Sequence, residues 1–422
     1  MSNDEVNGMS RRRVVITGLG VVSSIGLGKD EFWRALLSGQ SGIKRIQSFD
    51  ASLYASQIAG EISNFPVEDF FPCGASARLS RASQLALVAS QMALEDAHLD
   101  CTNCEQDRVG SVIGTAMGGT EVYENQLRRL IESNNPRRVH PLSVPLIMTN
   151  APAAEVAIRY GLKGPNMTVS TACSSGSHAI GYGLDLIRSG RVDTMLAGGT
   201  EACIVPGVFA GFNSLRALSV HNKEPERASR PFDRTRDGFT IGEGAGVLIL
   251  ETLESAKQRG APIYAEVAGY AASCEACHIV HPETTGTEQA RVMELALNDA
   301  RIPAGQVDYI NSHGTSTVLN DLTETNAIKK LFGCYAYRIS VNSTKSMIGH
   351  TIGAAGAIEA VVCALTLHHK VLHPTINYEN ADPDCDLDYT PNHASEKDVH
   401  VALSNSFGFG SNNACLVMKA LS

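Results

Sequence analysis

Cys173 lies in a stretch of small and polar residues, where a predicted strand meets a predicted helix. Residues 166–171 alternate apolar and polar side chains, as a strand does, and residues 174–188 carry apolar side chains at helical spacing. A thiol at a helix start meets free backbone N–H groups and the positive end of the helix dipole. We therefore expect Cys173 to have a lowered pKa and to act as a nucleophilic thiolate, with a buried structural cysteine as the alternative.

Two histidines occur in similar contexts in the second half of the chain. Residues 307–317 predict a strand that ends in a polar turn carrying His313, and residues 338–357 predict a strand, a loop with Lys345 and a helix that begins near His350. Catalytic groups tend to gather at such strand ends in α/β proteins. Either histidine alone would more often be structural, but one cysteine with two histidines in matching contexts indicates nucleophilic catalysis.

The elements that carry these residues repeat one plan. Residues 166–188 and 338–369 each predict a strand, a Ser-Thr pair, a reactive residue, a loop of small residues and a helix. This weak internal duplication predicts two similar α/β halves packed face to face. A polar segment with turn residues lies near residue 260. We therefore expect a disordered tail over 1–12, a half over 13–260 with the nucleophile, and a half over 261–422 with the histidines.

Composition limits the possible functions. The 35 basic and 44 acidic residues give a net charge of −9, which gives no support to nucleic-acid binding. No uninterrupted apolar run reaches the ~18 residues that a membrane span needs. The polar N-terminus does not resemble a secretory signal, so a cytoplasmic protein is expected. The odd number of cysteines, 11, argues against a disulfide framework.

Three local patterns suggest cofactors, and each is weak. Cys101 with Cys104 and Cys274 with Cys277 form two Cys-x-x-Cys pairs, but ~170 residues separate them, which is unlike a zinc site. The second pair precedes His278, as in c-type haem attachment, but no export signal accompanies it. The glycines of residues 18–20 begin a dinucleotide fingerprint that lacks its third glycine. We therefore expect neither a metal nor a bound cofactor.

Eight stretches of the chain resemble the β-ketoacyl-[acyl-carrier-protein] synthases of the elongating, type II kind, in the thiolase superfamily. The resemblance implies an α/β thiolase fold with five layers, α-β-α-β-α, built from two duplicated halves. It also implies a Cys-His-His set rather than the Cys-His-Asn set of initiating ketosynthases. The matching stretches are RVVITGLG (13–20), TACSSG (171–176), AGGTEA (197–202), SRPFD (229–233), DGFTIGEG (237–244), HGTST (313–317), STKSMIGH (343–350) and NSFGFG (405–410).

The resemblance implies a decarboxylative Claisen condensation, for which residue chemistry suggests the roles. Cys173 would take the acyl group from an acyl carrier protein, and the backbone N–H groups of Cys173 and Phe407 would form the oxyanion hole. His313 and His350 would stabilise the enolate that malonyl carrier gives on decarboxylation. By resemblance, Phe407 would also gate the acyl site. The chain departs from the family here, because Gly410-Ser-Asn-Asn413 replaces Gly-Gly-Thr-Asn.

Further residues receive supporting roles by the same resemblance. Lys345 would pair with Glu359 and favour neutral histidines. The pantetheine arm would bind Thr315 and Thr317. The substrates would arrive on phosphopantetheine, so acyl carrier protein is the expected partner of a homodimer, or of a heterodimer with a ketosynthase-like subunit. The acyl tunnel would be lined by Met117 and Phe212, and the acidic carrier would dock on Arg78, Arg81, Arg128, Arg129 and Arg216.

Two alternatives to the condensing enzyme remain. A non-elongating partner subunit that sets chain length usually lacks the nucleophile, whereas Cys173 is present here with both histidines. A degradative thiolase usually carries a second cysteine in a Cys-x-Gly setting near its C-terminus, and Cys415 does not lie in that setting. The sequence does not distinguish fatty acid synthesis from a dissociated polyketide or polyene pathway, and it does not give the chain length.

Overall fold

The strands form two sets with the same order and the same directions. The computed structural model describes residues 11–63, 65–72 and 74–421, and within them one set runs β1–β8–β7–β5–β6 and the other β9–β15–β14–β10–β11. In each set the first three strands pair antiparallel and the last three pair parallel. The bounds are β1 Val14–Ser23, β8 Gly244–Thr252, β7 Thr194–Glu201, β5 Val109–Gly114, β6 Asn166–Val169, β9 Ala265–Cys274, β15 Asn412–Lys419, β14 Val401–Gly408, β10 Tyr309–Asn311 and β11 Ser340–Asn342.

The two sets meet along a short seam, where β1 pairs with β9 at Val15↔Glu266 and Ile16↔Ala265. Each set comes from one half of the chain, and the repeated topology confirms the predicted duplication. The predicted boundary near residue 260 falls between α9 (Leu253–Gln258) and β9.

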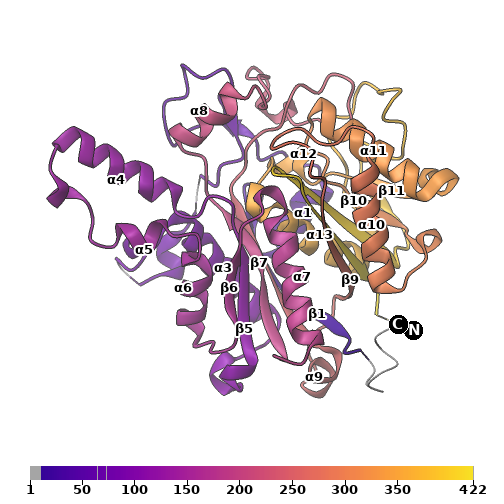
Figure 1. The fold of residues 1–422 in the computed structure, drawn as a ribbon, viewed down its shortest axis with the longest axis horizontal. Coiled ribbons are helices and arrows are strands. Elements are labelled where there is room, and N and C mark those ends of the chain that lie inside the picture. Colours follow the sequence, from indigo (N-terminus) through magenta and orange to yellow (C-terminus); the bar gives the residue numbers. More distant parts are fainter. Residues whose placement is uncertain (1–10, 64, 73, 422) are drawn as a thin grey trace.

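Helices complete five layers around the two sets of strands (Figure 1). Helices α7 (Ser175–Arg188) and α13 (Ala355–His369) lie between the sets and contact strands of both. Helices α3 (Arg81–Asp96) and α6 (Ala151–Tyr160) cover the outer face of the first set. Helices α10 (Thr287–Ala300) and α11 (Val318–Phe332) cover that of the second. The predicted α-β-α-β-α thiolase architecture is therefore confirmed.

The central helices approach each other closely because small residues line their contact. A Cβ added to Gly176 on α7 would lie 2.8 Å from the backbone nitrogen of Ala357 on α13. The stretch Ile352–His369 is long and apolar enough to cross a membrane, but it is 89% buried inside the molecule. It is therefore the core helix of the fold, and a helix that is apolar all round suits this place.

One arm extends away from the layers. Helix α4 (Thr120–Ser133) has no buried residue and projects beside α5 (Ser143–Ile147) in Figure 1. Its exposed apolar side chains include Tyr123, Leu127 and Ile131. The remaining helices and strands are α1 Lys29–Leu37, α2 Val67–Phe70, α8 Pro206–Ser214, α12 Lys345–Ile348, β2 Gly26–Leu27, β3 Lys44–Arg45, β4 Ile58–Ala59, β12 Val371–Leu372 and β13 Ser395–Glu396.

The predicted disordered tail over residues 1–12 is wrong for its last two residues. Residues 1–10 lie outside the described residues. Arg11 pairs with Asp299 at 2.5 Å, and Arg12 pairs with Asp193 at 2.9 Å. These two arginines are therefore anchored to the body of the protein, which corrects the prediction of a tail that reaches residue 12.

Candidate active site

Cys173 lies in a single 3₁₀ turn, Ala172–Ser174, between β6 and α7. Ala172 has a φ of +52°, a left-handed conformation that reverses the chain sharply before the helix. The Ser175 hydroxyl accepts a hydrogen bond from the N–H of Thr171 at 2.9 Å and donates one to the carbonyl of Ala172 at 2.7 Å. The strand–helix junction predicted from the sequence is present, and local hydrogen bonds fix its turn.

The expectation of a lowered Cys173 pKa is wrong for the resting protein. The residue is 7% exposed, and burial raises the pKa of its thiol to about 12. The backbone N–H of Phe409, the charge of Lys345 and the N–H of Cys173 itself act in the opposite direction. Loss of hydration therefore outweighs the helix start and the nearby donors, so the protonated thiol is favoured near pH 7.

His313 follows β10, and a buried carboxylate holds its backbone. Glu324 on α11 accepts hydrogen bonds from the N–H groups of His313 at 2.9 Å and Gly314 at 2.8 Å. The side-chain amide of Asn405 donates to the same carboxylate at 3.1 Å. The His313 Nδ1 atom is buried without a partner among the described residues, so no protein group fixes the tautomer through that nitrogen.

His350 lies in the turn between α12 and α13, rather than at the start of a helix. Its Nδ1 atom accepts a hydrogen bond from the N–H of Ile352 at 3.3 Å, which places the proton on Nε2. That Nε2 atom is buried and has no partner among the described residues. His350 therefore offers a fixed N–H donor that no described protein group uses.

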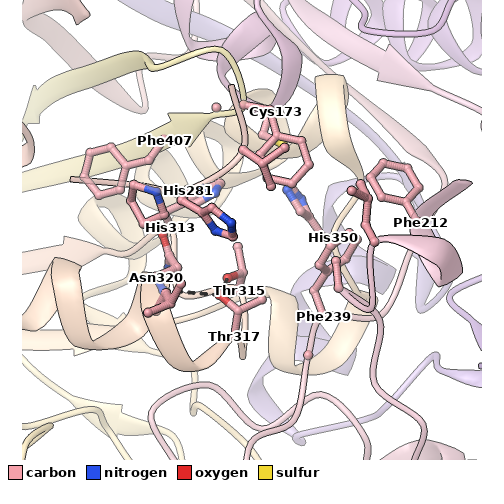
Figure 2. A pocket seen from close by; sticks show the side chains of 18 of the residues that line it. Cys173, Phe212, Phe239, His281, His313, Thr315, Thr317, Asn320, His350 and Phe407 are labelled. Atoms are coloured by element: carbon pink, nitrogen blue, oxygen red, sulfur yellow. Dashed lines mark hydrogen bonds between the residues drawn. The ribbon is translucent and has the colours of Figure 1, made fainter. Parts of the chain in front are cut away.

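The two imidazoles face one cavity together with Cys173. Their ring centroids are 5.3 Å apart, and burial with the charge of Lys345 holds both histidine pKa values well below the usual range. Both rings are therefore neutral near pH 7. Figure 2 shows the thiol and the two rings around a common space, which is a cavity of about 290 Å³. The structure thus brings together three residues from the two halves of the chain.

Lys345 and Glu359 form a fully buried ion pair behind the histidines. Lys345 begins α12 and is 1% exposed, and its ammonium donates to the Glu359 carboxylate on α13. Burial raises the pKa of Glu359 to about 7, and the Lys345 charge opposes that rise. Lys345 does not line the cavity, so it acts on the histidines through its charge and not through contact with a bound molecule.

The turn after β14 corrects the sequence analysis. Phe407 is still part of β14, where it pairs with Asn413, and its ring lies against His313 with centroids 5.7 Å apart. The N–H that reaches the Cys173 sulfur belongs to Phe409, and the Phe409 ring packs in the apolar cluster that contains Cys173. The roles expected of Phe407 therefore fit Phe409, two residues later.

Of the residues predicted to bind the pantetheine arm or to line the acyl tunnel, three line the cavity and one does not. Thr315 and Thr317 line the cavity and share a hydrogen bond of 3.0 Å, and Thr317 also caps α11. Phe212 on α8 lines the cavity and packs edge-on against Phe239. Met117 packs against the same apolar cluster as Cys173 but does not line the cavity.

The predicted docking arginines do not form one patch at the cavity. Arg216 is exposed and lines the cavity, whereas Arg128 and Arg129 lie on the projecting helix α4. Arg78 is exposed in the turn Ser76–Arg78. Arg81 pairs with Glu243 at 3.0 Å and stacks over Phe65, which makes it a structural cation.

Sequence reasoning missed three residues that shape the site. Phe409 lies in the quoted NSFGFG stretch, where the choice between two phenylalanines was the error. Glu324 and Glu201 are buried carboxylates, each with a pKa raised to about 7 by burial. The AGGTEA stretch contained Glu201, and an acidic residue at the end of a buried strand was the available signal.

Comparison with known proteins gives consistent matches over nearly the whole chain. The β-ketoacyl synthase N-terminal domain matches residues 11–256, and the C-terminal domain of the same family matches residues 264–379. The 3-oxoacyl-[acyl-carrier-protein] synthase 2 of Synechocystis sp. is 46% identical over 97% of this chain and 99% of its own length. The Coxiella burnetii protein of the same name is 44% identical over 97% and 99%.

Solved structures agree with these relatives. The ketosynthase complex AntDE:AntF, in which a type II polyketide carrier protein is bound to its ketosynthase, has a TM-score of 0.92 at 39% identity and covers 98% of this chain and 100% of the matched chain. The ishigamide ketosynthase/chain length factor has a TM-score of 0.91 at 39% identity, with the same coverage. A β-ketoacyl synthase from Burkholderia phymatum has a TM-score of 0.91 at 36% identity, covering 97% and 100%.

Proposed function

Because this chain belongs to the β-ketoacyl synthase family, we propose that it elongates acyl chains by decarboxylative condensation on acyl carrier protein. The observation that carries the proposal is the shared cavity of Cys173, His313 and His350, three residues from two halves of the chain. The product is 3-oxoacyl carrier protein. The enzyme is an acyltransferase that needs no bound cofactor, because phosphopantetheine on the carrier brings both substrates.

The first half-reaction loads the enzyme. The Cys173 sulfur attacks the acyl thioester carbonyl, and a new C–S bond joins the acyl group to the enzyme. The C–S bond to the carrier breaks, and the carrier sulfur takes up the proton that the Cys173 thiol loses. The backbone N–H groups of Cys173 and Phe409 stabilise the oxyanion. The backbone N–H groups of both residues act to lower the pKa of the Cys173 thiol, which supports this assignment.

The second half-reaction forms the carbon–carbon bond. Malonyl carrier loses carbon dioxide, and the electron pair of the broken bond enters an enolate whose oxygen accepts hydrogen bonds from the imidazoles. The enolate carbon then attacks the acyl carbonyl on Cys173, and the sulfur departs. The Nε2–H of His350 is suited to the enolate oxygen because its Nδ1 is already occupied by Ile352. Burial, with the charge of Lys345, lowers both histidine pKa values and keeps both rings neutral.

The walls of the cavity suggest where each substrate part lies. The pantetheine arm passes Thr315 and Thr317, and the acyl chain extends past Phe212 toward Met117. Phe409 acts as the gate in place of Phe407, since its ring and its N–H both lie beside Cys173. The acidic carrier docks at the rim near Arg216, and the exposed Arg78, Arg128 and Arg129 would contact it only outside that rim.

The protein works as a homodimer. Strand β6 is at the edge of its sheet, where it pairs only with β5 among the described residues, and Met167 on it is 40% exposed. An unpaired edge strand with apolar side chains is suited to a second copy. The arm made by α4 and α5 carries further exposed apolar residues. A heterodimer with a ketosynthase-like subunit would use the same edge, and the setting is the cytoplasm.

One assay tests the activity and sets the pathway. The protein is incubated with malonyl carrier and a ladder of acyl carriers, and intact-protein mass spectrometry identifies the products. We expect each accepted acyl carrier to gain two carbons and a 3-oxo group. The longest accepted chain and any repeated extension would distinguish fatty acid from polyketide synthesis. No extension of any acyl carrier would contradict the proposal, including its rejection of a chain-length partner role.

A further inference from the structure

Glu201 is a buried carboxylate that holds both halves of the site without touching the cavity. It ends β7 and is fully buried. Its Oε1 accepts from the Thr115 hydroxyl and the Met117 N–H, both at 3.1 Å. Its Oε2 accepts from the N–H of Ala116 at 2.9 Å and from the N–H of Gly353 at 3.0 Å. Three of these donors lie in the first half of the chain, and Gly353 lies in the second.

The Gly353 contact restrains the turn that orients His350. Ile352 has a φ of +44°, a conformation that a β-branched residue rarely adopts and that costs about 1–3 kcal/mol unless its surroundings enforce it. The N–H of Ile352 donates to His350 Nδ1, and the next N–H, of Gly353, donates to Glu201. The strained turn is therefore held at two successive donors.

The duplicated fold shows why this carboxylate is unusual. In the first half, Ala172 at φ +52° precedes Cys173 in the 3₁₀ turn before α7. In the second half, Ile352 at φ +44° precedes Gly353 in the 3₁₀ turn before α13. Gly353 thus occupies the place of the nucleophile, and the Glu201 carboxylate accepts the N–H that corresponds to the backbone N–H of Cys173.

Space at this place excludes any side chain on the glycine. A Cβ added to Gly353 would lie 2.6 Å from the Ala116 nitrogen and 2.7 Å from Glu201 Oε2. Contacts that short require the carboxylate or the backbone to move. At the turn position that carries Cys173 in the first half, the second half therefore has a glycine whose N–H donates to the Glu201 carboxylate.

We propose that Glu201 is a positioning residue for condensation, which fixes His350 through the Ile352–Gly353 turn and fixes the segment 115–117 that packs against the apolar cluster around Cys173. This inference rests on the proposed function. All four of its partners donate, and the four hydrogen bonds favour the ionised carboxylate, although burial opposes it. A glutamine at position 201 would turn its NH₂ group toward two of these donors. It would therefore release either the turn at Gly353 or the segment 115–117.

The test compares half-reactions in the full-length protein. Glu201→Gln should lower kcat for decarboxylation of malonyl carrier about tenfold or more, because displacements near 1 Å can cost 10²-fold. KM for malonyl carrier should stay within about twofold, since the arm-binding residues are untouched. Acyl transfer to Cys173, followed in a single turnover, should fall less than decarboxylation.

Two further variants separate positioning from stability. Gly353→Ala keeps the carboxylate but displaces it, and it should reproduce the loss of decarboxylation. Glu251→Gln is the matched control, because Glu251 is a buried carboxylate on β8 that pairs with Arg259, and neither residue lines the cavity. It should lower the melting temperature and leave the half-reaction constants unchanged.

The outcomes distinguish the positioning role of Glu201 from the proposed function of the protein. A Glu201→Gln protein with wild-type decarboxylation would overturn the positioning role, as would an equal kinetic loss in Glu251→Gln. Either result would leave the proposed function intact if the wild-type protein condenses. A wild-type protein that neither condenses nor decarboxylates would overturn the proposed function together with this inference.

Discussion

At the scale of single residues, the decisive property is the dehydration of Cys173. Burial raises the pKa of the thiol to about 12, so the fraction of thiolate should rise about tenfold with each pH unit below that value. The rate of Cys173 alkylation by iodoacetamide, mapped by peptide mass spectrometry, should therefore increase steadily from pH 6 to pH 9. A plateau below pH 8 would show that the helix start and the nearby donors outweigh burial after all.

The buried ion pair gives a second prediction at this scale. Lys345→Met leaves the Glu359 carboxylate without its partner and should cost about 3–5 kcal/mol of unfolding free energy near pH 8. A carboxyl whose folded pKa is raised contributes stability below its unfolded pKa and loses it as pH rises. The cost should therefore be smaller at pH 5.5 than at pH 8, as measured by urea unfolding.

The matched control also removes the charge of Glu359, which Lys345→Met leaves without a partner. Lys345→Met combined with Glu359→Gln should recover most of the lost unfolding free energy, because a neutral amide needs no counter-charge. An equal loss at both pH values, or no recovery in the double variant, would contradict the assignment of this pair as an electrostatic unit.

At the scale of elements, the end of β5 must approach the start of α7 for the nucleophile turn to form. A Cβ added to Gly114 would lie 2.4 Å from the carbonyl carbon of Ser175. Gly114→Ala should cost about 1–3 kcal/mol and slow acyl transfer to Cys173. Gly305→Ala is the control, because its added methyl meets no atom within 4 Å. Wild-type acyl transfer in Gly114→Ala would contradict this close packing.

The elements also show what the sequence could reveal. The junctions carrying Cys173 and His313 were predictable, because strand period, helix period and turn residues are local signals. The thiol pKa was not, since it depends on water excluded by segments far away in the chain. The choice of Phe407 over Phe409 failed for a related reason. Only the register of β14 against β15 shows that Phe407 is still within the strand.

At the scale of the whole molecule, the duplication explains how distant residues meet. The first half delivers the Cys173 turn and the second half delivers the turns of His313 and His350 to one cavity, although ~140 residues or more separate the cysteine from either histidine in the chain. The family, the thiolase fold and the acyltransferase class predicted from the sequence are confirmed. The roles of the individual residues remain predictions for the experiments.

The edge strand β6 gives a prediction about the proposed homodimer. If two copies pair along β6, a charge at its exposed apolar position should weaken the dimer. Met167→Asp should therefore shift the protein toward monomer at micromolar concentration in sedimentation velocity, while Lys163, before the strand, can be changed to Gln without effect. A wild-type protein that sediments as a monomer would contradict this use of the edge.

The most direct test of the central claim separates the two half-reactions in one variant. Cys173→Gln is incubated with malonyl carrier and acyl carrier, and intact-protein mass spectrometry reads the carriers. The account predicts that acetyl carrier forms, because both imidazoles remain, and that no 3-oxoacyl carrier forms. Appearance of 3-oxoacyl carrier in this variant would contradict the account.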